Sequence, residues 1–281
     1  MKISNIHSTA LLVDHLTIGY GDRPLVRDIS IEMAPGECVL LAGANGTGKT
    51  TLLKALASGG MGPENLRSLR DLRPSHKWAP PASRSLVSTP VAPYKGASAL
   101  RGVPRVAQFS EHTPSSARVI LIPTNIPKVK GFTVESFIHT GCYRESDWRG
   151  RISEEVAMKM EEALEVLGIQ ELKNRDISTL SDGEFKKACL AVGLTRRAEV
   201  LLLDEPTAFL DVENRISVLE TLREVARKTG TAILFSSHDL HDALPVVDRV
   251  FVLTRDGRFV VSEADNKEAV LRAAFPNLST L

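Results

Sequence analysis

Apolar residues recur in two different patterns along the beginning of the chain. The segments 10–20, 25–33 and 37–43 are short, rich in apolar and β-branched residues, and separated by turn residues. Segments of this kind predict β-strands. In the next segment, 49–57, the apolar residues have helical spacing. The beginning of the chain therefore predicts three strands followed by a helix.

The segment 151–169 has a clear helical period. Its apolar residues recur every three or four positions, and acidic residues occupy the opposite side, which predicts an amphipathic helix. We interpret its methionines, Met158 and Met160, as core residues because methionine readily fills irregular gaps. The predicted buried face consists of Val156, Met160, Ala163, Leu164 and Leu167.

Helices alternate with apolar strands over the rest of the chain. The segment 200–206 begins with a run of apolar residues that is typical of a fully buried strand. The alternation predicts an α/β core built on a mostly parallel sheet. The expected elements are helices over 181–198 and 212–228, strands over 200–206 and 231–237, and a hairpin around Asp256 and Gly257.

Residues 59–117 show no sustained period. Eight of the 15 prolines fall between Ser58 and Arg118, and we interpret the segment as an irregular surface insertion. From Ser58 to Arg118 there are nine Lys or Arg and three acidic residues, a balance of +6, which leaves the remainder of the chain near −5. A solvated loop is the simpler interpretation, and contact with anionic lipid headgroups or with a partner is the alternative.

Composition is that of an ordinary soluble globular protein. The 281 residues are 43% hydrophobic and 25% charged. This length is sufficient for one large domain, or for two small ones, with a substantial core. The net charge of +1 gives no general attraction to nucleic acid or to an anionic membrane, so we expect no nucleic-acid partner. No segment reaches the roughly 18 apolar residues of a membrane span, and the N-terminal apolar run is too short for a signal peptide.

The cysteines give no sign of a disulfide framework or a zinc site. Cys38, Cys142 and Cys189 are far apart and form no C-x-x-C pair. A reducing, cytoplasmic location fits this usage best.

The stretch Gly43–Thr50, "GANGTGKT", matches G-x-x-x-x-G-K-[ST] and lies between a predicted strand and a predicted helix. Its glycines allow successive backbone N–H groups to surround phosphate oxygens. Lys49 would place a positive charge at the outer phosphates, and the Thr50 hydroxyl would be offered to Mg²⁺. The stretch therefore predicts a phosphate-binding loop that works with a metal ion.

Two acidic residues and one histidine follow predicted strands. Asp204 would hold Mg²⁺ through water, and Glu205 would face the γ-phosphate and polarise the attacking water. His238 closes the next predicted strand, at the edge where α/β sheets bind ligands. A histidine at a strand end is more often only held by hydrogen bonds, so its position alone does not assign it a function.

Ser181 and Glu184 have the S-x-x-E spacing of a capping box that opens the predicted helix 181–198. Most such matches are caps and nothing more. A helix N-terminus with exposed N–H groups is also an anion site, so this one could serve a phosphate as well.

Five motifs occur along the chain in the order "GANGTGKT", "LSDGE", "VLLLDEP", "AFLD" and "SSH". In this order and spacing they resemble the motif set of ABC-type ATPases: the Walker A loop, the signature, Walker B, the D-loop and the switch histidine. The resemblance covers nearly the whole chain. It implies an α/β fold with a P-loop NTPase core on a mostly parallel sheet, an N-terminal antiparallel β subdomain and an inserted α-helical signature subdomain.

The same resemblance implies a set of site residues. Two copies would dimerise head to tail with ATP between the Walker A loop of one and the signature of the other, so that Ser181 and Gly183 act in trans. His238 would contact the γ-phosphate, and Tyr20 resembles the aromatic residue that stacks on adenine. The implied ligands are ATP and Mg²⁺. The implied catalytic residues are Glu205, His238 and Thr124, and the implied metal ligands are Thr50 and Asp204. The implied nucleotide-binding residues are Tyr20, Gly43, Ala44, Asn45, Gly46, Thr47, Gly48, Lys49, Thr50, Thr51, Ser181, Gly183, Glu184 and Asp211.

The segment 132–155, followed by "LSDGE", resembles more narrowly the ATP-binding subunits of importers for iron-siderophores, haem and cobalamin. Gly141, Tyr143, Trp148 and Gly150 occupy the corresponding places. This resemblance implies ATP hydrolysis that powers import through transmembrane permease subunits, served indirectly by a substrate-binding protein. It also implies a cytoplasmic protein, peripheral on the inner face of the cell membrane, that does not touch the cargo.

We expect a single ABC ATPase domain over 1–281. Its expected parts are a β-rich start at 8–35, a nucleotide-binding core at about 36–58 and 195–262, the insertion at about 59–117, and a helical subdomain at about 125–194.

Two residues depart from the family pattern. Asp182 stands where the signature usually has a glycine, which puts a carboxylate near a phosphate unless the side chain points away. Thr124 stands where a glutamine usually links Mg²⁺ and water to the surface that meets the membrane subunit. The other candidate for that role, Gln108, lies sixteen residues upstream in the insertion. We favour Thr124, whose shorter side chain would act through water.

Two other functions stay open at this point. One is a soluble ABC ATPase that works as a regulatory or nucleic-acid-associated clamp without a transporter, although the chain has neither a second cassette nor long coiled coils. The other is a binding module without turnover, which the departures at Thr124 and Asp182 keep open.

Overall fold

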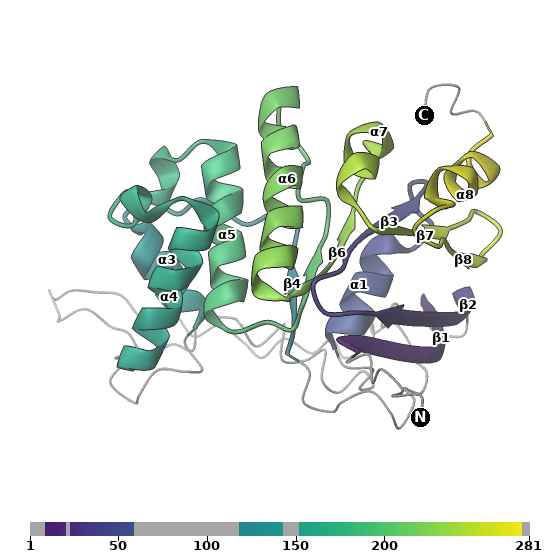
Figure 1. The fold of residues 1–281 in the computed structure, drawn as a ribbon, viewed down its shortest axis with the longest axis horizontal. Coiled ribbons are helices and arrows are strands. Elements are labelled where there is room, and N and C mark those ends of the chain that lie inside the picture. Colours follow the sequence, from purple (N-terminus) through teal and green to yellow (C-terminus); the bar gives the residue numbers. More distant parts are fainter. Residues whose placement is uncertain (1–8, 21–22, 59–117, 143–151, 277–281) are drawn as a thin grey trace, which may run out of the picture.

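A six-stranded sheet runs through the molecule in the order β4-β5-β6-β3-β7-β8 (Figure 1). The computed structural model describes residues 9–20, 23–58, 118–142 and 152–276. Neighbouring strands are parallel except β7 and β8, which pair antiparallel. The strands are β3 (Cys38–Gly43), β4 (Val119–Ile122), β5 (Val200–Leu203), β6 (Ala232–Ser236), β7 (Arg249–Leu253) and β8 (Phe259–Val261).

Different elements cover the two faces of this sheet. One face carries an antiparallel pair of strands, β1 (Leu11–Tyr20) and β2 (Arg23–Met33), together with helix α1 (Lys49–Ala57). The other face carries the long helix α6 (Val212–Thr229). The elements that complete this second layer are α7 (Leu240–Ala243), the 3₁₀ helix η4 (Leu244–Val246) and α8 (Lys267–Ala274).

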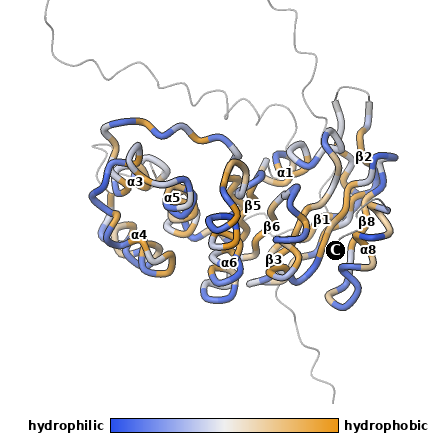
Figure 2. Tube along the Cα trace, turned by 90° about the horizontal axis from the view of Figure 1, so that it is seen from above, coloured by the Kyte–Doolittle hydropathy of each residue, from blue (hydrophilic) through white to orange (hydrophobic). Residues whose placement is uncertain are grey.

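A group of helices extends beyond the β4 edge of the sheet, next to α6, in both Figure 1 and Figure 2. In the core of this group, helix α5 packs against α3 and α4. The members are α3 (Val134–Gly141), α4 (Glu154–Leu167) and α5 (Asp182–Thr195), with the 3₁₀ helices η2 (Gln170–Leu172) and η3 (Ile177–Thr179) between them.

The sheet lies between two hydrophobic cores, because alternate residues of a strand point to opposite faces. In β3, Cys38, Leu40 and Ala42 belong to the core shared with the helices α3 to α6, whereas Val39 and Leu41 belong to the core shared with β1, β2 and α1. Figure 2 shows the hydrophobic strands at the centre of the molecule. The continuous apolar runs in the sequence are therefore strands that are buried on both faces.

Helix α4 buries the face that its sequence predicts, but one methionine departs from the prediction. The buried residues of α4 are Val156, Met160, Ala163, Leu164 and Leu167. Met158 is 61% exposed, so its interpretation as a core residue was wrong. Two positions along a helix correspond to a turn of about 200°, which carries Met158 away from the face of Val156 and Met160.

Gly141, the last residue of α3, is required by its close approach to α5. A Cβ atom at this position would come within 2.3 Å of the Val192 Cγ1 atom. We expect Gly141→Ala to lower the free energy of unfolding by about 1–3 kcal/mol, the usual cost of overpacking, as measured by urea denaturation. Adding Val192→Ala should recover part of this loss. Strictly additive effects of the two substitutions would contradict this explanation.

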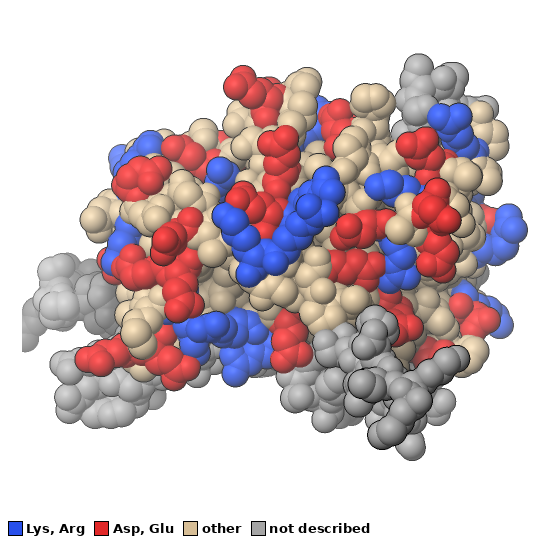
Figure 3. All heavy atoms as spheres, in the orientation of Figure 1, with Lys and Arg blue, Asp and Glu red and all other residues tan. Residues whose placement is uncertain are grey.

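The predicted strands and helices are present wherever the structure describes them, and the hairpin at Asp256 and Gly257 is confirmed. Their bounds differ from the predicted ones by up to three residues: the strand predicted over 200–206 ends at Leu203, and the helix predicted over 181–198 ends at Thr195. The insertion 59–117 and the alternative candidate Gln108 lie outside the described residues, as do Tyr143, Trp148 and Gly150. Among the described helices, none combines the length and the hydropathy that a membrane span needs. Figure 3 shows acidic and basic side chains interspersed over one face.

Candidate functional site

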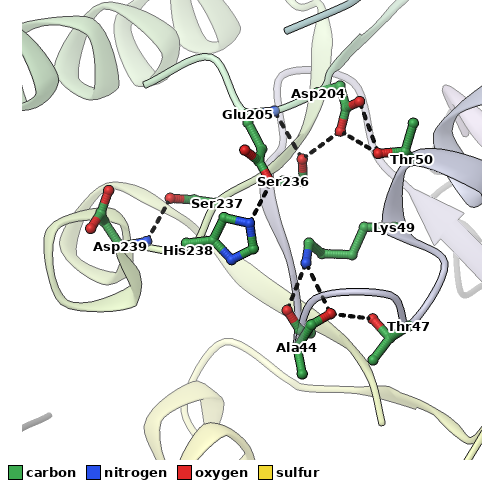
Figure 4. A network of polar contacts seen from close by, with 11 residues as sticks. Ala44, Thr47, Lys49, Thr50, Asp204, Glu205, Ser236, Ser237, His238 and Asp239 are labelled. Carbon is green, nitrogen blue, oxygen red and sulfur yellow. Dashed lines mark hydrogen bonds and ion pairs between the residues drawn. The ribbon is translucent and has the colours of Figure 1, made fainter. Parts of the chain in front are cut away.

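Three of the predicted motifs follow neighbouring strands of the sheet. The phosphate loop follows β3, Asp204 and Glu205 follow β5, and His238 lies two residues after β6. Strand β6 lies between β5 and β3, and all three strands are parallel. Because the carboxyl ends of parallel strands lie at one edge of a sheet, these residues come together there (Figure 4).

The loop 44–48 leads from β3 into the N-terminus of α1. Gly46 and Gly48 have φ angles of 82° and 103°, in the left-handed region that glycine adopts without steric cost. The Thr47 hydroxyl donates a hydrogen bond of 2.9 Å to the Ala44 carbonyl, which closes the turn. Gly48 precedes the helix and offers no side chain as a cap. The first N–H groups of α1 are therefore suited to an anion.

Lys49, the first residue of α1, turns its side chain back over this loop. Its Nζ atom donates hydrogen bonds to the carbonyl oxygens of Gly43, at 2.7 Å, and Ala44, at 3.2 Å. Burial lowers the pKa of Lys49, and the charges of Glu205 and Asp204 act in the opposite direction. The buried Lys49 side chain thus lies over the loop, beside the place where phosphates would bind.

Thr50 connects the phosphate loop to β5. Its hydroxyl donates to both carboxylate oxygens of Asp204, at 3.0 and 2.9 Å. Mg²⁺ takes oxygen ligands and is usually held by one or two carboxylates together with substrate phosphates. A hydroxyl and a buried carboxylate in direct contact, next to a phosphate loop, fit this ion.

Ser236 connects Asp204 to Glu205, a role that our sequence analysis missed. This fully buried serine donates its hydroxyl hydrogen to the Asp204 Oδ1 atom at 3.1 Å, and it accepts a hydrogen bond of 2.9 Å from the Glu205 backbone N–H. The available signal was a polar residue that ends a buried strand two positions before His238. Its partners belong to a different strand, so they could be identified only once the strand order was known.

The side chains of Glu205 and His238 meet at the opening of the site. The His238 Nε2 atom contacts the Glu205 Oε1 atom (Figure 4). Glu205 has a φ angle of 49°, in the left-handed region that non-glycine residues seldom adopt. Such strain is typical of functional sites. Both side chains remain partly exposed, at 29% for Glu205 and 43% for His238, so substrate and water can reach them.

The turn after His238 is held in place by contacts to a serine and to α6. The backbone N–H of Asp239 donates to the Ser237 hydroxyl at 3.0 Å. Arg215, on α6, forms ion pairs with Asp239 at 2.9 Å and with Asp242 at 3.1 Å. These contacts fix the backbone on which the imidazole is carried.

The start of α5 is separated from the phosphate loop of the same chain. Ser181 accepts a hydrogen bond of 3.2 Å from the Glu184 N–H, and Glu184 accepts one of 2.7 Å from the Ser181 N–H, so the predicted capping box is confirmed. Figures 1 and 2 both place α5 in the helical group and α1 beside β1 and β2. The structure therefore does not bring Ser181 to Lys49 within one chain.

Gly183 and Asp211 meet through a shared neighbour. A Cβ atom at Gly183 would lie 2.9 Å from the Asn214 Oδ1 atom. Asp211 caps α6 by accepting a hydrogen bond of 2.8 Å from the Asn214 N–H. The predicted signature and D-loop are thus adjacent.

Thr124 lies two residues beyond β4, on the same edge of the sheet as Asp204. Its carbonyl accepts a hydrogen bond of 3.0 Å from the Lys186 Nζ atom. The residue borders a surface hollow of about 140 Å³ together with Asp182. Among the described residues, no hydrogen bond joins the Thr124 side chain to Glu205.

The other predicted nucleotide contacts differ in how far the structure describes them. Asn45 is exposed at the tip of the phosphate loop, and Thr51 is buried in α1. Tyr20 ends β1, but its side chain lies outside the described part of the chain.

Comparison with known families decides the identity of this fold and site. The model of the family described as "ABC transporter" matches residues 26–208, from β2 to the first residue of the predicted D-loop. The chain belongs to the ABC transporter family. As an ABC protein with the ATP-binding motifs, it binds nucleotide and is an ATPase, which confirms the resemblance that the five motifs indicated.

Relatives with established names include two ATP-binding proteins of importers. The chain is 29% identical over 235 residues to the iron(3+)-hydroxamate import ATP-binding protein FhuC of Bacillus subtilis, covering 83% of this chain and 75% of that protein. It is 30% identical over 248 residues to the zinc import ATP-binding protein ZnuC of Cereibacter sphaeroides, covering 88% of this chain and 80% of that protein. The cargoes in these two names differ.

A solved structure supports the fold assignment. The nucleotide-free ATP-binding cassette from an ABC transporter superimposes with a TM-score of 0.68 at 17% identity, covering 97% of this chain and 98% of that one. At this identity the similarity shows the fold alone. It confirms the predicted P-loop NTPase fold with an antiparallel β pair and a helical group.

Proposed function

We propose that this ABC ATPase powers an importer for metal chelates, with iron-siderophores, haem and cobalamin as the expected cargoes. Two copies bind ATP head to tail, and their closure is transmitted to separate transmembrane permease subunits. A substrate-binding protein delivers the cargo to these permease subunits. The chain then works at the cytoplasmic face of the membrane. The resemblance of 132–155 and the FhuC relative support a chelate, whereas the ZnuC relative makes zinc the competing cargo.

One observation carries the proposed chemistry: the continuous contacts from Thr50 through Asp204, Ser236 and Glu205 to His238. They join the end of the phosphate loop to a carboxylate that can activate water. A module that only bound nucleotide would not need Glu205 and His238 in contact at the open side of this loop.

The residues divide the work at the phosphates between them. Lys49 and the N–H groups of 44–49 bind the outer phosphates of ATP. Thr50 and Asp204 would hold Mg²⁺, which would neutralise negative charge on those phosphates when bound. Ser236 keeps Asp204 and the Glu205 backbone in one arrangement, so the metal site and the catalytic carboxylate are positioned together.

Glu205 acts as the general base for hydrolysis. Its carboxylate accepts a proton from the attacking water, and His238 holds the carboxylate through its Nε2 contact. The imidazole would then contact the γ-phosphate of bound ATP. The buried Asp204 cannot take this role as easily, because the Thr50 and Ser236 hydroxyls already donate to its oxygens.

A second copy of the chain completes the site. Ser181 and Gly183 lie apart from the phosphate loop of their own chain, so they would serve the ATP held by the partner copy. Phe209 is 85% exposed and Val212 is 61% exposed, and both lie beside Asp211. Apolar side chains that are exposed together are typical of an interaction surface, which supports dimerisation through this segment.

The proposal is tested by reconstitution. The chain should co-purify with the membrane proteins encoded beside it, and proteoliposomes containing the complex should show ATP-dependent uptake of a labelled ferric chelate. If the proteoliposomes took up zinc ions but not the ferric chelate, the cargo would be a metal ion instead of a chelate. Failure to co-purify with any membrane protein, together with hydrolysis that such proteins do not stimulate, would favour the soluble clamp instead.

Thr124 is expected to take part in coupling to the permease, given its place on the sheet edge beside Asp204. In the reconstituted complex, Thr124→Ala should lower permease-stimulated hydrolysis by about tenfold, the effect of losing one water-mediated positioning contact in an active site, and Gln108→Ala should leave it near the parent rate. Phosphate release with and without cargo measures both. The opposite ranking would assign the coupling role to Gln108.

A further inference from the structure

Two lysines join the loop after β4 to the start of α5. Lys186, on α5, donates to the Thr124 carbonyl at 3.0 Å. In the other direction, Lys128 reaches from the loop to the Leu180 carbonyl at 2.8 Å and to the Asp182 Oδ1 atom at 2.6 Å. Neither lysine was assigned a role by the sequence. Together they connect the segment that carries Thr124 to the signature.

Asp182 creates an electrostatic conflict in the proposed function. It is the first residue of α5, between Ser181 and Gly183, and its side chain is 63% exposed. A carboxylate at a helix N-terminus is favourable for the isolated helix. It competes, however, with any phosphate that approaches the same N–H groups, and two negative charges in contact repel each other strongly.

The contact with Lys128 places a positive charge beside the Asp182 carboxylate, which can offset its negative charge. The Lys128 side chain is only 25% exposed and its Nζ atom lies 5.4 Å from the centroid of the Phe185 ring. The loop is also held at Gly131, whose N–H donates to the Asp176 Oδ2 atom at 2.7 Å. The ammonium therefore lies between the Phe185 ring, the Leu180 carbonyl and the Asp182 carboxylate.

We propose that Lys128 is a positioning residue that holds the Asp182 carboxylate against the loop after β4 and neutralises it, so that the signature of this copy can receive the phosphate of the partner's ATP. This inference rests on the proposed head-to-tail dimer. Lys128 does not touch the nucleotide. It acts through Asp182, and its contribution should disappear when Asp182 is replaced.

The experiment separates charge from packing. Lys128→Met keeps the apolar stem beside Phe185 and removes only the ammonium, and Lys128→Arg restores a positive charge. Asp182→Gly introduces the residue that the family usually has. Lys130→Met is the matched control, because Lys130 is an exposed lysine of the same loop whose charge acts on Asp176. Each variant is made alone and in the Glu205→Gln chain.

The first measurement is the ATP concentration that half-saturates dimerisation of the Glu205→Gln chain, determined by light scattering. Lys128→Met should raise it by about tenfold, in line with the cost of an unpaired like charge, whereas Lys130→Met should change it less than twofold. Lys128→Arg should stay near the parent. In the presence of Asp182→Gly, Lys128→Met should change it less than twofold, because no carboxylate is left to neutralise.

The second measurement is ATP binding to dilute monomer, which should be unchanged by Lys128→Met since Lys49 and its loop are untouched. If Lys128→Met weakens dimerisation equally with and without Asp182→Gly, the lysine acts through the Leu180 carbonyl or through folding, and the proposal is overturned. The same holds if Lys128→Met and Lys130→Met behave alike. If the Glu205→Gln chain forms no ATP-dependent dimer at all, the head-to-tail arrangement itself fails, which is a different result.

Discussion

Replacing Glu205 with glutamine is expected to reduce the rate of ATP hydrolysis by about 10²–10⁴-fold, the usual contribution of a general base. The amide has nearly the shape of the carboxylate but cannot accept a proton from water. ATP binding should remain, because Lys49, Thr50 and Asp204 are unchanged. Steady-state phosphate release measures the rate, and size-exclusion chromatography with ATP should reveal a long-lived dimer.

Glu220 provides the matched control for this substitution. It is an exposed glutamate on α6, so Glu220→Gln makes the same chemical change away from the site and should leave the rate within about twofold of the parent, as surface substitutions usually do. Full activity of Glu205→Gln would remove Glu205 from the role of base and leave the function of the 205–238 contact unexplained.

The second large effect is expected from His238→Ala, which should lower kcat by about 10²-fold, as expected when one positioned group at the transition state is lost. The carboxylate of Glu205 would lose the imidazole that holds it, and the γ-phosphate would lose a contact. The dissociation constant of ATP should change little. Phosphate release and equilibrium binding of a fluorescent ATP analogue separate the two quantities.

His241→Ala is the control for His238→Ala. The His241 side chain is 80% exposed and faces Asp242 instead of Glu205, so its loss should be nearly silent. Combining His238→Ala with Glu205→Gln should cost little more than Glu205→Gln alone, because residues that act as a unit have non-additive effects. Additive losses, or equal losses for the two histidines, would argue that His238 and Glu205 do not act together.

Local pattern was sufficient to predict most elements of this fold. The apolar runs at β3, β5 and β6 and the helical period of α4 are governed by burial, which repeats regularly along the chain. Met158 shows the limit of residue-type arguments. Its hydrophobic character suggested the core, whereas its position in the helical period, which decides burial, places it in solvent.

Contacts between distant segments were the part that the sequence could not supply. The phosphate loop and the acidic pair were recognisable because their chemistry requires fixed spacings. Ser236 and Lys128 act on residues 32 and 54 positions away, and no periodic signal connects such pairs. Lys128 in particular becomes meaningful only beside Asp182, the residue at which the chain departs from its family.

Strand β6 lies between β5 and β3, and the residue at its end shapes the catalytic centre. Helix α1, which follows β3, contacts β5, so the Thr50 hydroxyl bridges directly to the Asp204 carboxylate at 2.9 and 3.0 Å. The Ser236 side chain, at the end of β6, donates to the same carboxylate and so packs against this bridge. A bulky residue there would wedge the bridge open, whereas glycine would leave a polar void. A small hydroxyl side chain has the size that fits this position. The residue at the end of β6 therefore determines how Asp204 and Thr50 are placed relative to each other.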